Sequence, residues 1–474
     1  MLISKSNDRS RKNLEWAILI LSSVLLGIWA AKETIALRNI LLFGGAPLSI
    51  YYIAQEFKHG DLKEQCDFWR VLPIFLLGLT FVWVLVHYLF FSIDSSQQLD
   101  ELKSTWLRAF MATIVGLATG LALRNHPNRL NLLWSGIFIA FIVLFYQYIP
   151  RAFAQQKLFV PDYDQYLFHL KINTVLMGTI LLAGIDGALF DHLRAIQYRW
   201  RYFRIVSLLF WFVGTVMALW SFVYIVDARN GIGVSTILYG FWFICATVIL
   251  IQGQIKQKKL IGWALFLFAS AGLLLILYFA SLQTKMNSGW SSLISDAKIA
   301  VQIDRYPNWQ NLGQLGYPKR EDGQMVTSNT YERVAWAVAG SRAILQDPTG
   351  VGILSYPFAM HPYRPSNMQL GSGMPGIATH SGWVELGLAF GLPMLSLIFF
   401  GLLISFGNAL RNNYPVKMTT LGLIFLISTL YTVGEAAIDH GIEVLFFMLA
   451  LIPALMLVRP YTFKAMTRLE LSAQ

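Results

Sequence analysis

Residues 260–281, LIGWALFLFASAGLLLILYFAS, form an apolar run of 22 residues that contains no charged side chain. A helix that crosses the hydrocarbon core of a membrane needs about 20 such residues. Eleven further runs of this kind occur in the chain, so the sequence predicts about twelve transmembrane helices. The predicted spans lie near residues 15–31, 35–54, 71–93, 106–123, 131–150, 173–191, 204–225, 232–252, 260–281, 383–405, 418–434 and 441–458.

The composition of the whole chain agrees with this prediction. Of the 474 residues, 56% are hydrophobic and only 13% are charged, whereas a soluble domain carries about 25% charged residues. These values exclude a soluble enzyme, a disordered protein and a fibrous protein. We therefore expect an all-α polytopic membrane protein.

The distribution of Lys and Arg predicts how the chain is oriented. Cytoplasmic loops are rich in these residues. With the N-terminus in the cytoplasm, 21 of the 37 Lys and Arg residues fall in cytoplasmic segments, 8 in the short outer loops and the span ends beside them, and 8 in one long loop. We therefore expect both termini to be cytoplasmic. The net charge of +11 then reflects membrane topology and requires no nucleic acid partner.

One long connection interrupts the series of short loops. Residues 282–382 form a polar segment rich in Gly, Pro, Asn and Tyr, which the topology places on the periplasmic side. The chain is thus expected to have nine transmembrane helices in 1–281, a periplasmic loop that contains helices in 282–382, and three transmembrane helices with a cytoplasmic tail in 383–474. Long loops in compact proteins are usually functional, so we expect the site there.

Within this loop, residues 329–345 have the pattern of a helix. Asn329 is expected to cap its start, with Glu332 three residues later forming a capping box, and Pro348 to end it. At about 100° per residue, Arg333 and Arg342 point to opposite faces. Arg333 has small neighbours and is a candidate ligand-binding residue, whereas we expect Arg342 to be a solvated or interface arginine.

His380 lies where the long loop enters the next predicted span, and Ser381 is expected to cap that helix. The positive end of a helix dipole disfavours imidazolium, and a neutral imidazole is what a general base requires. The alternative is an interfacial histidine that bonds to a neighbour. Arg229, in a very short outer loop, suits a phosphate ligand or lies among the lipid headgroups.

Weaker signals come from acidic residues. A short outer turn holds Glu435, Asp439, His440 and Glu443, which could bind an acceptor but are expected to be solvated. Asp162 and Asp164 resemble a metal-binding pair, although a polar loop explains them as well. Asp186 lies inside a predicted span, where an acid usually has a polar partner. No metal site and no cofactor are predicted.

Three motifs in this order resemble those of the bacterial O-antigen ligase superfamily. They are Glu332-Arg333-Val334-Ala335-Trp336-Ala337, Asp347-Pro348-Thr349-Gly350-Val351-Gly352 and His380-Ser381-Gly382-Trp383-Val384-Glu385-Leu386-Gly387. The resemblance covers about residues 205–405, and the number of spans fits the whole chain. It implies a fold related to the GT-C class and a metal-independent, inverting glycosyl transfer at the periplasmic face of the bacterial inner membrane.

The resemblance also assigns roles to residues. His380 would activate the acceptor hydroxyl, while Arg333 and Arg229 would hold the donor pyrophosphate. Further candidates are Arg305, Tyr331, Arg364 and Glu385, of which Glu385 would be the alternative base.

The expected partners are a glycan linked to undecaprenyl pyrophosphate, a lipid A-core acceptor and membrane lipid. An O-antigen polymerase or a protein O-oligosaccharyltransferase would use the same donor with another acceptor. A polysaccharide transporter or flippase is an alternative of a different class, which predicts broken helices with ionisable residues near the membrane midplane.

Overall fold

The chain is almost entirely helical in a computed structural model, which describes residues 2–59, 67–161, 163–194, 201–252, 256–310, 312–355, 357–360, 379–412, 414–437 and 440–458. Each of the twelve predicted apolar runs overlaps a helix, and the described residues form an all-α structure as predicted. These helices are α1 (Leu2–Ile28), α2 (Ile35–His59), α4 (Phe68–Phe90), α6 (Leu107–Leu123), α7 (Leu130–Gln155), α8 (Lys171–Arg194), α9 (Arg201–Trp220), α10 (Arg229–Gln252), α11 (Lys256–Met286), α15 (Gly382–Arg411), α16 (Lys417–Val433) and α17 (Gly441–Leu455).

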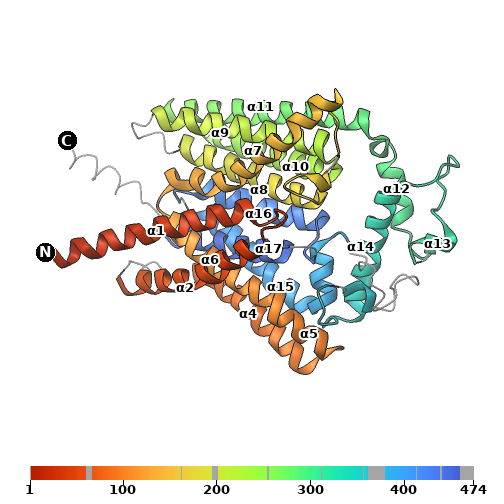
Figure 1. Cartoon of the computed structure of the whole chain (residues 1–474), viewed down its shortest axis with the longest axis horizontal. Helices are drawn as coiled ribbons and strands as arrows, with labels where there is room; N and C mark the ends of the chain where they lie inside the picture. Colours follow the sequence, from red (N-terminus) through yellow and green to blue (C-terminus); the bar gives the residue numbers. More distant parts are fainter. Residues whose placement is uncertain are drawn as a thin grey trace.

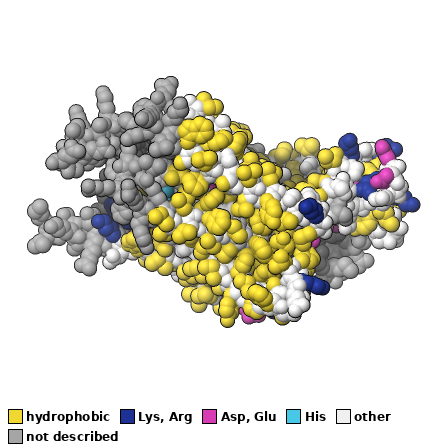
Figure 2. Space-filling model, turned by 90° about the horizontal axis from the view of Figure 1, so that it is seen from above, with side chains coloured by type: hydrophobic (Ala, Val, Ile, Leu, Met, Phe, Trp, Pro, Cys, Tyr) yellow, Lys and Arg dark blue, Asp and Glu magenta, His cyan; other side chains and the backbone are white. Residues whose placement is uncertain are grey.

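Eight helical segments among the described residues are long and apolar enough to cross a membrane, as expected of a multi-pass membrane protein. The helices α16 and α17 are apolar but have only 17 and 15 residues, and α1 and α2 are not among the eight. The total of twelve spans therefore stays a prediction. On the face that Figure 2 shows, hydrophobic side chains cover the middle of the molecule, and a group of charged side chains lies at one end.

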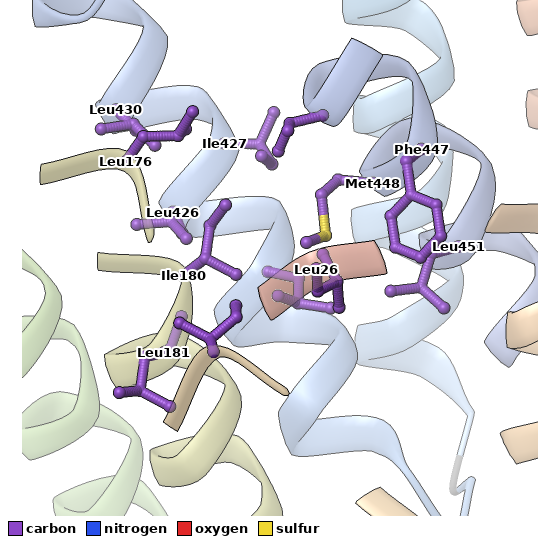
Figure 3. Packing of buried hydrophobic residues seen from close by; sticks show 14 of the residues in the cluster. Leu26, Leu176, Ile180, Leu181, Leu426, Ile427, Leu430, Phe447, Met448 and Leu451 are labelled. Atoms are coloured by element: carbon purple, nitrogen blue, oxygen red, sulfur yellow. The ribbon is translucent and has the colours of Figure 1, made fainter. Parts of the chain in front are cut away.

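The core of the helical body lies between α1, α8, α16 and α17. Leu26 of α1, Ile180 of α8 and Leu426 of α16 are fully buried and lie close together with Phe447 of α17 (Figure 3). Because α16 and α17 are surrounded by other helices, the short turn that joins them is held by neighbouring elements as well as by its own chain.

The two ends of the helical body differ. At the end where α1 begins, Glu15 pairs with Arg129 and Glu56 pairs with Arg124, each at 2.7 Å. These residues lie in or beside segments predicted to be cytoplasmic. At the opposite end lie α12 (Leu293–Ala300), α13 (Leu312–Leu315) and α14 (Ser328–Gln346) (Figure 1).

The segment between α11 and α15 has short helices and its own hydrophobic cluster. The helices are η5 (Ser288–Trp290), α12 (Leu293–Ala300), η6 (Pro307–Gln310), α13 (Leu312–Leu315), α14 (Ser328–Gln346) and η7 (Pro357–Met360). The buried residues of the cluster come from this segment, apart from Leu388 of α15. The loop is therefore a packed layer that sits on α15.

The start of α14 differs from the prediction. The residue that precedes the helix is Thr327, whose backbone N–H donates to the buried carboxylate of Asp296 at 3.1 Å. Asn329 already lies inside the first turn, so it does not cap the helix. Glu332 accepts a hydrogen bond from the hydroxyl of Tyr317 and so does not complete a capping box. Both predictions were wrong because Asp296, a distant residue in the sequence, supplies the acceptor at this end.

The helix α14 ends at Gln346, as Pro348 predicts, and the next residues enter a break in α15. Gly391 has a φ of 70° inside α15. Around this break, backbone groups of the loop and of α15 form hydrogen bonds with each other. Val351 N–H donates to Leu388 O at 2.9 Å, and Leu392 N–H donates to Pro348 O at 2.8 Å. The run predicted as one continuous helix is therefore two helical pieces, and loop residues 348–352 form hydrogen bonds with the backbone at the break between them.

The same loop is anchored on its other side by α4 and α5 (Ser95–Glu101). The carboxylate of Glu101 accepts the N–H groups of Leu354 and Ser355 at 2.7 and 2.8 Å. The ring of His87, which is fully buried, contacts Gly350 O at 3.1 Å. The end of α14 is thus fixed between α4, α5 and α15, which sets the position of the arginine side chains on α14.

Candidate functional site

The ring of His380 forms a pair with a carboxylate from a distant turn. His380 precedes α15 with a φ of 57°, and its Nδ1 contacts Oε1 of Glu435 in the turn after α16. The side chain of His380 is 24% exposed, whereas that of Glu435 is 5% exposed. We infer that Nδ1 carries the ring proton and donates a hydrogen bond to the carboxylate, which leaves the lone pair on Nε2.

A tryptophan from α14 fixes the plane of this imidazole. The rings of Trp336 and His380 are stacked, with centroids 5.8 Å apart and an angle of 26° between the planes. Trp336 lies three positions after Arg333 on the same helix. The contact therefore brings the arginine helix of the long loop next to the start of α15.

The start of α15 also holds the turn that carries Glu435. The carboxylate of Glu385, which is fully buried, accepts the N–H groups of Ala436 and Ala437 at 2.7 and 2.9 Å. Ser381 occupies the capping position, but its hydroxyl donates to Tyr431 O at 3.5 Å and makes no side-chain cap. The expected role of Ser381 as a capping side chain is therefore wrong.

Arg333 lies half-buried on α14, within the electrostatic reach of two other site residues. Burial lowers the pKa of Arg333, the Glu435 carboxylate raises it, and the Arg229 guanidinium lowers it. Arg229 and Glu435 therefore both lie within electrostatic reach of Arg333. Within the described ranges, Arg333 forms no hydrogen bond or ion pair.

Arg229 begins α10 and lies half-buried against the loop that follows α11. Its Nη1 atom is buried and has no hydrogen-bond partner among the described residues, and a Cβ atom added at Gly289 would overlap it. Asp227, with a φ of 47°, is held by Gln283 Nε2 at 2.5 Å and by the amide of Asn287. These contacts hold the turn that precedes Arg229.

A small cavity is lined by Glu435 and by Asn230, the residue that follows Arg229. Its volume is about 10 Å³, which is about the size of one water probe. Asn173, Asn230 and Glu435 contribute polar groups to its wall. The second oxygen of Glu435, Oε2, is buried with no hydrogen-bond partner in the described part of the chain. The carboxylate thus faces His380 with one oxygen and leaves the other unsatisfied.

The structure places the other predicted residues in different surroundings. Arg342 forms an exposed ion pair with Asp304, with N–O distances of 2.7 and 2.8 Å, as expected of a solvated arginine. Arg305 is exposed, and its guanidinium lies over the aromatic ring of its neighbour Tyr306. The hydroxyl of Tyr331 is bonded to the backbone of the loop core, and burial raises its pKa to about 12. Arg364 lies outside the described residues.

The acidic outer turn was predicted to be solvated, and this is wrong for two of its members. Glu435 is buried against His380. Glu443 is fully buried and its carboxylate binds Arg108 at 2.5 Å, Trp29 at 2.9 Å and His440 at 3.1 Å. Asp439 lies outside the described residues. Nothing in the local sequence around Glu435 and Glu443 indicated burial, which depends on the packing of other helices against them.

Among the described residues, the remaining acids form no metal centre. Asp162 lies outside the described residues, and Asp164 lies in the short helix η3 (Tyr163–Gln165). Asp186 has the polar partner expected of an acid in a span, since Trp211 Nε1 donates to it at 2.6 Å. In the part of the chain that the structure describes, no three His, Cys, Asp or Glu side chains are grouped so that they could hold a metal ion.

The fold and the site define an all-α multi-pass membrane protein with a histidine–carboxylate pair beside two arginines that lack anionic partners in the described residues. Comparison with known proteins finds no matching family model, no matching curated protein and no matching solved structure. The function is therefore argued from the site itself.

Proposed function

We propose that this chain is a membrane glycosyltransferase of the O-antigen ligase type, which moves a glycan from undecaprenyl pyrophosphate to a hydroxyl of a lipid A-core acceptor. The observation that carries the proposal is the proximity of the His380–Glu435 pair to Arg333 and Arg229. A base beside two cations suits a reaction that removes a proton from one substrate and places negative charge on the other.

The histidine supplies the first half of the chemistry. Nε2 of His380 takes the proton of the acceptor hydroxyl while that oxygen forms a bond to the anomeric carbon of the donor glycan. The Glu435 carboxylate holds the ring in one tautomer and stabilises the imidazolium that results. General-base catalysis of this kind contributes roughly 10²–10⁴-fold to a rate.

The arginines supply the second half. The bond between the anomeric carbon and the pyrophosphate oxygen breaks, and its electron pair leaves with the diphosphate. Arg333 and Arg229 stabilise that charge, because a guanidinium presents two parallel donors to phosphate oxygens and stays protonated when half-buried. The reaction is a single displacement without an enzyme nucleophile or a metal ion, so it inverts the anomeric centre.

The proposal includes a topology. The protein lies in the bacterial inner membrane with about twelve spans in a GT-C-like arrangement, both termini are cytoplasmic, and residues 282–382 are periplasmic. An impermeant thiol reagent applied to intact cells tests this with Ser328→Cys and with the native Cys66. We expect labelling at position 328 and not at Cys66, and the reverse pattern would overturn the topology.

The acceptor is tested by the lipopolysaccharide profile of a deletion strain. Loss of all capped core supports the ligase. Core that still bears a single repeat unit instead supports an O-antigen polymerase, and an intact profile together with loss of glycan from periplasmic proteins supports a protein O-oligosaccharyltransferase. All three enzymes share the donor chemistry proposed above and differ only in the hydroxyl that approaches His380.

A transporter or flippase is the second candidate, and the break in α15 is the observation that favours it. However, the carbonyl groups that the break frees are already bonded, since Gly352 N–H donates to Ala389 O at 2.6 Å and Val351 N–H donates to Leu388 O. A transport site at a broken helix would instead keep such groups for its cargo. The glycosyltransferase therefore accounts for more of the structure.

A further inference from the structure

We propose that Glu385 is a positioning residue for this reaction, because it fixes the turn that carries Glu435 and, through Glu435, the imidazole of His380. The kinetic part of this inference rests on the proposed glycosyl transfer. Its structural part, the protonation pattern of the His380 ring, can be measured without any substrate.

The contacts of Glu385 are directed at the turn rather than at its own helix. One carboxylate oxygen, Oε2, accepts the backbone N–H groups of both Ala436 and Ala437. These are the two residues that follow Glu435. A buried backbone N–H that loses its acceptor is destabilising, so the turn keeps this geometry only while the carboxylate is in place.

A second contact holds the turn on the other side of Glu435. The N–H of Gly382 donates to Gly434 O at 2.6 Å, and a Cβ atom at Gly382 would overlap the ring of Tyr431. Residues 434–437 are not helical, so they lack the internal hydrogen bonds that fix a helix. Their conformation depends on the start of α15, on which His380 also lies.

The burial of Glu385 excludes a direct role with a soluble substrate. Its side chain is fully buried, whereas the ring of His380 is partly exposed. Its other oxygen, Oε1, has no hydrogen-bond partner among the described residues. Glu385 therefore cannot meet an acceptor hydroxyl in this conformation and does not replace His380 as the base.

The first experiment compares Glu385→Gln with Glu385→Leu by ¹⁵N NMR of histidine-labelled protein, at a pH where the imidazole is neutral. The His380 signal is assigned from its absence in His380→Ala. The amide oxygen of Gln can still accept both N–H groups, whereas Leu has a similar size and no acceptor. We expect wild type and Glu385→Gln to carry the proton on Nδ1, and Glu385→Leu to lose this preference as Glu435→Leu does.

A folded Glu385→Leu protein that keeps the wild-type tautomer would overturn the positioning role. Folding is checked by thermal unfolding in detergent. If Glu385→Leu does not fold, Glu385→Ser gives the same comparison, because its shorter side chain cannot span the distance to the two N–H groups.

The second experiment is a double-mutant cycle on turnover. Glu385→Leu is expected to lower kcat roughly 10-fold or more, within the roughly 10²–10⁴-fold that a general base contributes, with little change in KM for the donor. In a Glu435→Leu background it should have no further effect, because its influence passes through Glu435. Effects that multiply would contradict the proposal. Absence of transfer by the wild type would instead overturn the proposed function and leave the NMR result standing.

Discussion

The imidazole of His380 contacts the carboxylate of Glu435, although the two residues are 55 positions apart in the chain. His380 stands at the start of α15 and Glu435 stands in the turn after α16, so the pair forms only when these helices pack side by side. Since the ring is partly exposed and the carboxylate is buried, the histidine is the member that can meet a substrate.

Substitution of the pair should stop the reaction without unfolding the protein. His380→Ala is expected to lower turnover by about 10²–10⁴-fold, the usual contribution of a general base, and Glu435→Gln by a smaller factor, because the base remains but is no longer oriented. Turnover is measured with purified donor and acceptor. His126→Ala, at the opposite end of the molecule, is the control, and near-wild-type turnover of His380→Ala would remove the histidine as the base.

The three arginines should separate into two classes. Arg333→Ala and Arg229→Ala are expected to abolish donor binding, because each removes a cation from the pyrophosphate site. Arg342→Ala should be mild, since its exposed ion pair with Asp304 is worth at most about 1 kcal/mol. Binding of the lipid-linked donor to each purified variant provides the measurement. An inactive Arg342→Ala beside an active Arg333→Ala would contradict the assignment.

Replacement of Arg333 by lysine should make donor binding sensitive to alkaline pH. Burial lowers the pKa of the cation at this position, and lysine begins from an ordinary value of only about 10.4. As pH rises, Arg333→Lys should therefore lose its positive charge and its affinity for the donor, whereas the wild type keeps both. Donor affinity is measured as a function of pH, with Arg342→Lys as the control. Parallel pH curves for Arg333→Lys and wild type would count against this role of Arg333.

Periodicity and position in the sequence predict part of this site. The nine-residue separation of Arg333 and Arg342 predicted their different surroundings. The position of His380 at the end of the long loop made it a candidate site residue. Glu435 was missed as a partner, because a turn between two apolar runs looks solvated until the packing of α15 against it is known. The capping of α14 was missed for the same reason, since its acceptor, Asp296, comes from another helix.

An added side chain at Gly289 should displace Arg229 while leaving the fold intact. A Cβ atom there would overlap the guanidinium, so Gly289→Ala is expected to displace Arg229 and to raise KM for the donor, with a smaller effect on kcat. Gly233→Ala is the matched control, because an added Cβ at Gly233 meets nothing within 4 Å. Equal KM values for the two variants would show that Arg229 does not depend on this contact.

The break in α15 should also be sensitive to an added side chain. Gly391 has a φ of 70°, and an added Cβ would overlap the backbone of Pro348. Gly391→Ala should therefore destabilise the protein by at least the roughly 1–3 kcal/mol that a strained backbone conformation costs. Gly407→Ala, in the same helix with open space around it, should be neutral. Thermal unfolding in detergent compares them, and equal transition temperatures would contradict the inserted loop.

This break marks the limit of what hydropathy predicts. Residues 383–405 form one apolar run, and neither their length nor their composition reveals that backbone groups from Pro348 to Gly352 enter it. The signals that were present are Gly391 and Pro393 inside the run, together with the two glycines after Pro348. Their meaning depends on a contact between distant segments, which the fold supplies.

The most direct test of the central claim is transfer by the purified protein from an undecaprenyl-pyrophosphate-linked glycan to lipid A-core. The products are followed as glycan-bearing lipid A-core and as released undecaprenyl pyrophosphate, for wild type, His380→Ala and Arg333→Ala. We predict that the wild type forms both products in equal amounts, with an inverted anomeric linkage, and that neither variant does. Transfer that persists in both folded variants, or a wild type that binds the donor and releases no undecaprenyl pyrophosphate with any acceptor hydroxyl, would contradict the account.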